Sequence, residues 1–284
     1  MSKRSRCGQS DDIRGPAVAG GLGNPPRACG AEQGGNEAQR LLRGRQSRGG
    51  RDVNAQEFKV FAAGAAKEVV IRIAPEFAKA TDIKIAAVYD TVGALRDRLL
   101  QGEKADVAIL SNAALDTLET RNLIAAGSRR SLGSVAVALA IRKGAFTPDI
   151  STPEALKKVL LGVKSISYAD PEHGATAGTH FAKVLDRLGI RARIADRLSV
   201  LPFGVDVIQA VADGRFELGV SQSSEILLHP GVSLVGRLPE PYALVTSYAA
   251  AVLNGASANA RKLVDFLQTY AGKDALVEAG FSSE

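Results

Sequence analysis

From residue 57 onward the chain alternates short apolar runs with longer segments whose apolar residues recur at helical spacing. The run at 58–62 is followed by a segment at 65–79 in which Val69, Ile73 and Phe77 share one helical face. Strands that alternate with helices of this length favour right-handed crossover units and open, largely parallel sheets. The pattern therefore predicts an α/β fold and excludes a coiled coil as a description of the whole chain.

The same pattern gives bounds for each predicted element. The predicted strands are 58–62, 83–89, 105–110, 134–141, 165–168, 198–201, 217–221, 232–235 and 248–253. The predicted helices are 65–79, 92–100, 113–124, a helix that begins at Pro153, 176–188, 205–212, 224–228, 258–270 and 274–279. Thr152 is the expected N-cap of the helix that begins with Pro153 at its first position.

Residues 1–52 differ in kind from the rest. They carry ten basic and five acidic side chains and eleven of the 29 glycines, whereas residues 53–284 are nearly balanced, with 26 basic and 25 acidic groups. With few apolar residues to bury, 1–52 is predicted to be a disordered basic tail rich in Gly and Arg. Both cysteines, Cys7 and Cys29, lie in it, so the folded part is free of thiols, as suits an oxidising compartment.

The tail lacks the apolar core of a secretory signal, yet 54–57 resembles the remnant of an Ala-x-Ala-type cleavage site. Our hypothesis is that an export signal has been lost upstream of residue 53. The alternative is a basic arm that binds nucleic acid. No apolar stretch approaches the roughly 18 residues of a membrane span, so no such span is predicted.

Four loops that run from a strand into a helix are rich in small or hydroxylated residues; they are 62–67, 90–94, 170–179 and 221–225. The carboxyl ends of strands in such sheets converge on one crevice. The first turn of a helix offers unpaired N–H donors and a partial positive charge, so these loops predict a clamp for a small anion or carboxylate. In any single loop, Ser and Thr are equally explained as N-caps and Gly as a turn former.

Other motifs are sparse. The three histidines have no zinc spacing, and no catalytic or nucleotide-binding motif follows a strand, so neither a metal nor a cofactor is predicted. His180 falls inside a helix and is expected to be a surface or packed residue. His173, beside Glu172 in a candidate ligand loop, is a candidate donor or base. Lys67 is either a ligand contact or a solvated charge, and Arg96 is expected to face solvent.

At these loops the sequence resembles the periplasmic solute-binding proteins of bacterial ABC importers, type II fold, and within them the molybdate-binding branch. The resemblance covers about 57–281 and rests on segments at the strand ends, namely Phe61-Ala62-Ala63, Gly93-Ala94-Leu95-Arg96, Ala105-Asp106-Val107, Asp170-Pro171-Glu172-His173 and Leu218-Gly219-Val220. It implies a two-lobed fold in which each lobe is a mostly parallel sheet flanked by helices. It places lobe 1 at 57–136 plus 247–284 and lobe 2 at 137–246.

The resemblance also implies a function. The chain is expected to capture a small anion, an organic carboxylate or an oxyanion such as molybdate, between the lobes in the periplasm. It is expected to be a monomer that delivers the anion to an ABC permease and binds no nucleic acid. The ligand-binding residues implied by the loops are Gly64, Ala65, Ala66, Thr91, Val92, His173, Ala175, Thr176, Gln222 and Ser223.

Three of these positions bear on which anion is bound. Molybdate-binding members use two serines and a tyrosine where this chain has Ala65, Val92 and Gln222. Thr91, which directly precedes Val92, offers a hydroxyl beside that position. A larger and flatter organic acid fits Gln222, His173 and Thr176 better than a tetrahedral oxyanion does.

Two other functions compete with that of a receptor. An aconitate isomerase resembles the same branch, and its allylic proton transfer requires only carboxylate clamps and a base, for which His173 with Glu172 or Glu225 are candidates. The effector region of a transcription regulator is the third possibility. It requires a helix-turn-helix, and 1–52 contains no amphipathic helical trio.

Overall fold

The computed structural model describes residues 58–282. The predictions for the tail at 1–52 and for the cleavage-site remnant at 54–57 lie outside the described residues. Within 58–282, no helix is both long enough and apolar enough to cross a membrane.

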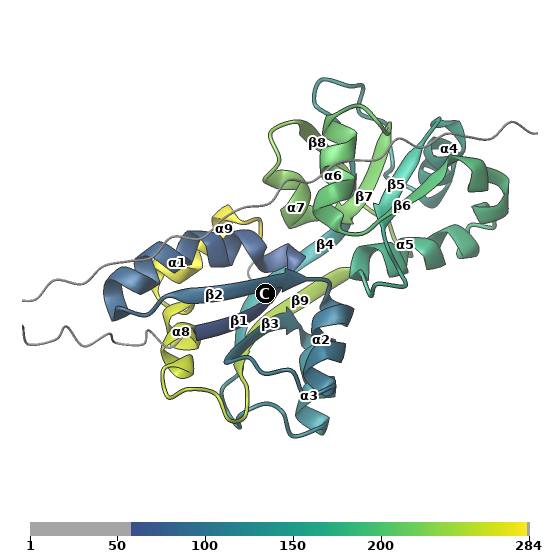
Figure 1. Ribbon diagram of the computed structural model, residues 1–284. Coiled ribbons are helices and arrows are strands. Elements are labelled where there is room, and N and C mark those ends of the chain that lie inside the picture. Colours follow the sequence, from purple (N-terminus) through teal and green to yellow (C-terminus); the bar gives the residue numbers. More distant parts are fainter. Residues whose placement is uncertain (1–57, 283–284) are drawn as a thin grey trace, which may run out of the picture. The chain divides into compact units, whose positions relative to one another are not determined.

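The chain alternates strands and helices as the sequence predicts (Figure 1). The strands are β1 (Phe58–Ala63), β2 (Ile85–Asp90), β3 (Val107–Ser111), β4 (Arg130–Arg142), β5 (Ile166–Ala169), β6 (Leu198–Leu201), β7 (Leu218–Gln222), β8 (Val232–Arg237) and β9 (Val245–Val252). The helices are α1 (Lys67–Thr81), α2 (Val92–Leu100), α3 (Asn112–Thr120), α4 (Pro153–Gly162), α5 (Thr176–Arg187), α6 (Gly204–Ala212), α7 (Ser223–Leu227), α8 (Ala260–Phe266) and α9 (Tyr270–Glu278). Two 3₁₀ segments complete them, η1 (Gly64–Ala66) and η2 (Arg191–Arg197).

The strand order is β2-β1-β3-β9-β4-β7-β5-β6, and β8 pairs with β4 outside this path. Strand β4 changes partner along its length. Its residues up to Ala136 pair antiparallel with β9, and from Val137 onward they pair with β7. The strand therefore runs from one group of elements into the other (Figure 1).

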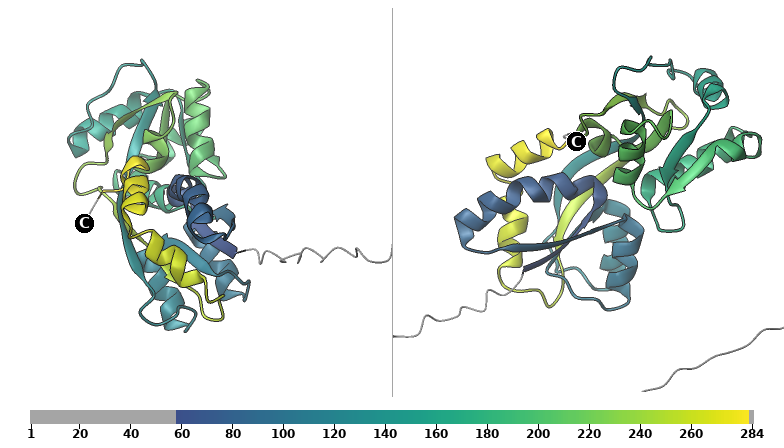
Figure 2. Two further views of the ribbon diagram at one scale, coloured as in Figure 1. Left: turned by 90° about the vertical axis from the view of Figure 1, so that its left-hand side faces the viewer. Right: turned by 45° about the horizontal axis from the view of Figure 1, so that its top comes forward.

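Buried side chains form separate cores on either side of this change of partner. The first core joins β1, β2, β3 and β9 to the helices at both ends of the sequence, and its members lie within 58–135 and 248–281. In it Phe77 of α1 packs edge-on against Phe266 of α8, with ring centroids 5.5 Å apart. Helices α1 and α9 also pack on each other, as the two views of Figure 2 show. We refer to this group of elements as the first half.

The second half has a core on each face of its sheet, because side chains alternate along β4. Val137 and Leu139 face the core that contains Phe181 of α5, while Ala138 faces the core that contains Val207 of α6. The members of these two cores lie within 137–238. The division into 57–136 plus 247–284 and 137–246 stays a prediction, and the separation of the cores supports it.

Local capping explains several element starts. The Thr152 hydroxyl accepts a hydrogen bond from Ala155 N with Pro153 at the first helical position, which confirms that predicted start. The helix predicted at 113–124 was too long, since α3 ends at Thr120 and Asn122 adopts a left-handed φ of 54°. The helix predicted at 258–270 was also too long, because Thr269 caps a new helix, α9. The 3₁₀ segment η2 was not predicted.

Candidate functional site

A cavity of about 230 Å³ lies between the first and second halves. Its walls come from both. The first half contributes Ala63, Gly64, Ala65, Lys67, Tyr89, Asp90, Thr91, Val92 and Tyr248. The second half contributes Ala169, Ala175, Thr176, Ala177, Phe203, Gly204, Val205, Ser221, Gln222 and Glu225.

The cavity is surrounded by the amino-terminal ends of helices. The first residues of α2, α5 and α6, which are Val92, Thr176 and Gly204, all line it. Ala175 and Phe203 are the N-caps of α5 and α6, and neither side chain makes a capping hydrogen bond. First-turn amides without a side-chain cap leave donors for another acceptor, and the helix dipole favours a negative one. The arrangement thus suits an anion.

The structure brings together seven of the ten residues that the sequence proposed as ligand contacts. Those that line the cavity are Gly64, Ala65, Thr91, Val92, Ala175, Thr176 and Gln222. Ala66, His173 and Ser223 do not line it. The binding role of each residue stays a prediction, but the geometry supports it for the seven.

Thr91 and His173 connect the two halves instead of facing the cavity with free polar groups. The Thr91 hydroxyl accepts a hydrogen bond from Ala94 N and donates one to the backbone oxygen of His173. The His173 ring lies 2.9 Å from Asp90 Oδ1 and packs edge-on against Phe203. These contacts occupy the Thr91 hydroxyl and hold the loop of His173 against the first half.

The remaining two proposed residues have structural roles. The Ser223 hydroxyl accepts a hydrogen bond from Ala136 N at 3.1 Å, at the point where β4 changes partner. Ala66 is fully buried in the first core. Both belong to the right loops, but their side chains point away from the cavity.

Four polar side chains of the cavity wall were not predicted as ligand contacts from the sequence. They are Tyr89 and Asp90 of β2, Ser221 of β7 and Tyr248 of β9. Glu225 was considered only as a partner of His173. Its Oε2 accepts hydrogen bonds from the Ser221 hydroxyl and from Gln222 N. The usable signal was the Gln222-to-Glu225 spacing, which places the Glu225 carboxylate within reach of the Gln222 backbone amide at the start of α7.

Burial changes the acidity of these groups. Burial raises the pKa of the Glu225 carboxyl above its ordinary value, and the nearby Asp206 adds to this, while Ser221, Gln222 and Lys67 oppose it. The pKa of the Tyr248 phenol is raised as well, first by burial and then by the negative charge of Glu225. Burial in the cavity wall therefore shifts Glu225 and Tyr248 toward their neutral forms.

Gln222 is the least satisfied polar group of the wall. Its side chain is 5% exposed, and both amide atoms are buried without a hydrogen-bond partner among residues 58–282. A buried amide without partners is costly, so it is expected to find them in a bound molecule.

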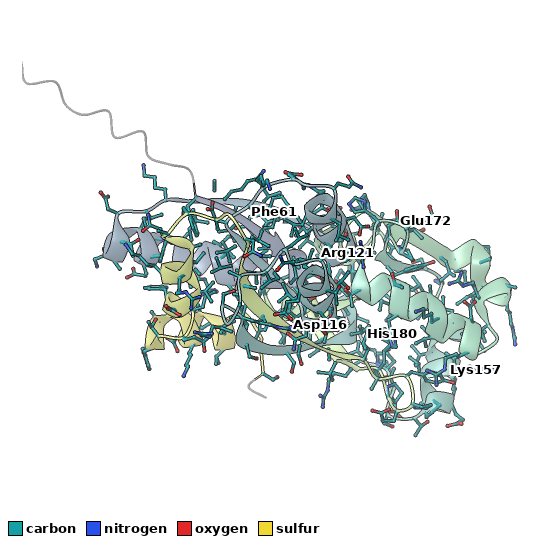
Figure 3. The ribbon with its side chains drawn as sticks, turned by 90° about the horizontal axis from the view of Figure 1, so that it is seen from below. Phe61, Asp116, Arg121, Lys157, Glu172 and His180 are labelled. Carbon is teal, nitrogen blue, oxygen red and sulfur yellow. The ribbon has the colours of Figure 1, made fainter. Side chains whose placement is uncertain are left out.

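Of the charged residues left open by the sequence, Lys67 lines the cavity and Arg96 does not. The Lys67 ammonium lies 5.6 Å from the centre of the Tyr89 ring, while Arg96 pairs with its neighbour Asp97. The side chain of Glu172 is exposed, and the ring of His180 hydrogen-bonds the backbone oxygen of Tyr242; both residues are labelled in Figure 3. Neither belongs to the lining of the cavity. Within 58–282, no cluster of three or more metal-ligating side chains occurs.

Comparison with known proteins identifies the class to which this fold and cavity belong. The family described as bacterial extracellular solute-binding protein matches residues 58–282. The chain belongs to this family, which confirms the predicted kinship and the type II α/β fold.

The similar proteins include an enzyme and two proteins named for molybdate binding or molybdenum transport. The chain is 30% identical over 229 residues to an aconitate isomerase from a Pseudomonas species, covering 78% of this chain and 86% of that protein. Its fold is similar to the periplasmic molybdate-binding protein of Azotobacter vinelandii, with a TM-score of 0.67, 19% identity and coverage of 80% and 100%. It is also similar to the substrate-binding domain of a putative molybdenum ABC transporter from Clostridium difficile, with a TM-score of 0.61, 21% identity and coverage of 80% and 99%.

Proposed function

We propose that this solute-binding protein captures a small organic acid in the cavity between its two halves. The observation that carries the proposal is the convergence of three helix amino-termini on one cavity, with Ala175 and Phe203 leaving two of them without side-chain caps. Their amide donors and dipoles suit carboxylate oxygens. Lys67, the one residue with a cationic side chain among the described residues of the lining, adds a positive charge to the same wall.

The lining favours a ligand with a carbon skeleton over a bare oxyanion such as molybdate. Ala65 and Val92 present hydrocarbon where molybdate-binding members present serine hydroxyls, and the Thr91 hydroxyl is already engaged. Phe203 and Val205 extend the apolar wall. Apolar walls with a few fixed polar groups are typical of sites for small organic molecules.

The family suggests where and with what the chain acts. We propose that it works in the periplasm, as a monomer, and hands its ligand to an ABC permease, with no part for nucleic acid. The family description, extracellular solute binding, and the ABC-transporter neighbours support the location and the permease partner. Ligand exchange then follows from opening and closing of the halves, since a ligand that contacts both stabilises the closed arrangement.

Isothermal titration calorimetry of the full chain tests the ligand class. The panel is citrate, cis-aconitate, trans-aconitate and succinate, with molybdate and sulfate as inorganic anions. We expect at least one carboxylate to bind with a dissociation constant of about 1 μM or less, roughly −8 kcal/mol. Binding of molybdate or sulfate alone, or of no member of the panel, would refute the proposal.

A second candidate is an allylic isomerase that acts on a tricarboxylate. It is favoured by the 30% identity to an aconitate isomerase and by a carboxyl, that of Glu225, in the cavity wall. The reaction removes a proton from the methylene carbon of aconitate and returns one to the former vinyl carbon, so the double bond moves and the formula is unchanged. Of the bases considered from the sequence, Glu225 is the one that the geometry supports, because His173 and Glu172 do not line the cavity.

Proton NMR in D₂O separates the receptor from the isomerase. An isomerase exchanges the methylene and vinyl protons of aconitate for deuterium and equilibrates its cis and trans forms. A receptor leaves both signals unchanged while still binding in the calorimeter. Catalysed exchange that persists in Glu225→Gln would exclude Glu225 as the base.

A further inference from the structure

The carboxyl of Glu225 lines the cavity close to residues of both halves. It comes from α7 in the second half, and a side chain built on Gly64 in the first half would come within 2.9 Å of its Oε1. A Cβ on Gly204, the first residue of α6, would overlap both Glu225 Oε2 and the Ser221 hydroxyl. Glycine at 64 and 204 thus leaves the space that this carboxyl fills.

The same carboxyl is reached from two sides. A second cavity, of about 180 Å³, shares Gly64, Ala65, Lys67, Val205 and Glu225 with the first. Its remaining walls are Glu68, Leu228 and His229. Glu225 therefore lines both the ligand cavity and a second cavity, and water in the second cavity can exchange protons with it.

Several titratable groups face Glu225 from the elements around it. They are Lys67 and Glu68 of α1, Asp206 of α6, Tyr248 of β9 and His229, which follows α7. Lys67 stabilises the charged carboxylate, whereas burial and Asp206 destabilise it. Together these groups raise the pKa of Glu225 above its ordinary value. An anion placed in the adjoining cavity adds a further negative charge and shifts this balance in the same direction.

We propose that Glu225 is a ligand-contacting carboxyl that takes up a proton when an organic anion fills the cavity and donates it in a hydrogen bond to that anion. This inference rests on the proposed function. It adds that capture of the ligand is coupled to the uptake of a proton. A neutral carboxyl beside the ligand can donate a hydrogen bond to the carboxylate of the ligand, whereas a charged carboxylate would repel it. The proton comes from solvent by way of the second cavity, and no bond of the ligand is broken.

Direct titration of Glu225 tests the carboxyl without any ligand. The full chain is labelled with ¹³C at the glutamate side-chain carboxyls, and the Glu225 resonance is assigned by its loss in Glu225→Gln. That variant keeps the shape of the side chain and an acceptor for the Ser221 hydroxyl. We expect this resonance to titrate at higher pH than the other glutamates between about pH 4 and 9. If the Glu225 resonance titrated over the same pH range as that of the exposed Glu76, the proposal would be overturned.

Proton uptake on binding tests the coupling. Calorimetry with cis-aconitate in two buffers of different ionisation enthalpy gives the number of protons bound with the anion. We expect uptake of up to about one proton in the wild type and in the control Glu76→Gln, with affinity rising up to about tenfold per unit fall in pH, and no uptake in Glu225→Gln. Equal uptake in all three chains, or none in the wild type, would overturn the proposal.

The two proposals fail separately. If the chain binds no anion of the panel, the proposed function fails, while the titration still decides about the carboxyl. If the Glu225 resonance titrates at higher pH than that of Glu76, the result supports a carboxyl that holds a proton. If the two titrate together, the result overturns the proposal. Gly204→Ala is a second variant. It displaces the carboxyl without removing it, so we expect it to bring the titration of Glu225 closer to that of Glu76.

Discussion

Gly93 and Gly174 join the two halves of the molecule through their backbones. The Gly93 amide donates a hydrogen bond to the Gly174 carbonyl at 3.2 Å. A Cβ placed on either residue would lie 2.7 Å from the Cα of the other. Gly93 belongs to the first turn of α2, and Gly174 precedes α5, so the contact lies beside two of the helix ends that line the cavity. Only glycines permit the halves to approach this closely here.

Replacement of Gly93 by alanine is expected to weaken ligand binding by about tenfold or more, near 1.4 kcal/mol, because the new methyl group pushes the halves apart. Calorimetry with the best-bound carboxylate measures the affinity, and small-angle scattering measures the expansion. Gly162→Ala is the matched control, since a Cβ there meets nothing within 4 Å. An unchanged affinity in Gly93→Ala would show that the contact does not matter for closure.

His173 is expected to hold the two halves together through its contact with Asp90 and not to contact the ligand. Its ring is 42% exposed, and it pairs with Asp90 across the two halves. Exposed pairs contribute about 1 kcal/mol at most, so His173→Ala should lower affinity by no more than about fivefold. A double-mutant cycle with Asp90→Asn should give a coupling of about the same size, reduced by salt. A loss of a hundredfold or more, unaffected by salt, would restore the direct ligand role predicted from the sequence.

Lys67 is expected to stabilise the bound anion. Replacement by methionine keeps the length of the side chain and removes the charge beside the cavity, so affinity for a carboxylate should fall by about tenfold. Arg96→Met is the control, because Arg96 pairs with Asp97 and does not line the cavity. Equal effects of the two substitutions, measured by calorimetry, would indicate only a general electrostatic attraction.

The first half should show an effect of pH on stability that arises from Glu103, which does not line the cavity. Hydrogen bonds from Arg98 and then Lys59 lower the pKa of Glu103 from 4.5 to about 2. A lowered pKa stabilises the fold above the unfolded value and the effect is lost as pH falls toward the folded one. Urea unfolding should therefore show wild type more stable than Glu103→Gln at neutral pH, with the difference shrinking between pH 4.5 and about 2. A difference that stays constant over that range would contradict the pairing.

The placement of the site could be predicted because strand ends and helix starts are encoded locally. Thr176 and Val92 were predicted as the first residues of helices at one crevice, and α5 and α2 begin at these residues. Both line the cavity. Periodicity and the convergence of strand ends in parallel sheets were sufficient for this.

Side-chain direction could not be predicted in the same way. Ser223 lies beside Gln222, yet its hydroxyl hydrogen-bonds Ala136 N, whereas Gln222 faces the cavity. Neighbouring residues at a helix start point in different directions, which the sequence does not reveal. Tyr248 was overlooked for a different reason, since β9 reaches the cavity from the far end of the chain. Contacts between distant segments depend on the packing of the whole sheet.

The most direct test of the account is a crystal structure of the full chain with the carboxylate that binds tightest in solution. We predict density for the ligand between the first turns of α2, α5 and α6, with a carboxylate group facing the amides after Ala175 and Phe203 and the amide of Gln222 hydrogen-bonded to the ligand. Density at any other place on the protein, with the cavity between the halves filled only by water, would contradict the account.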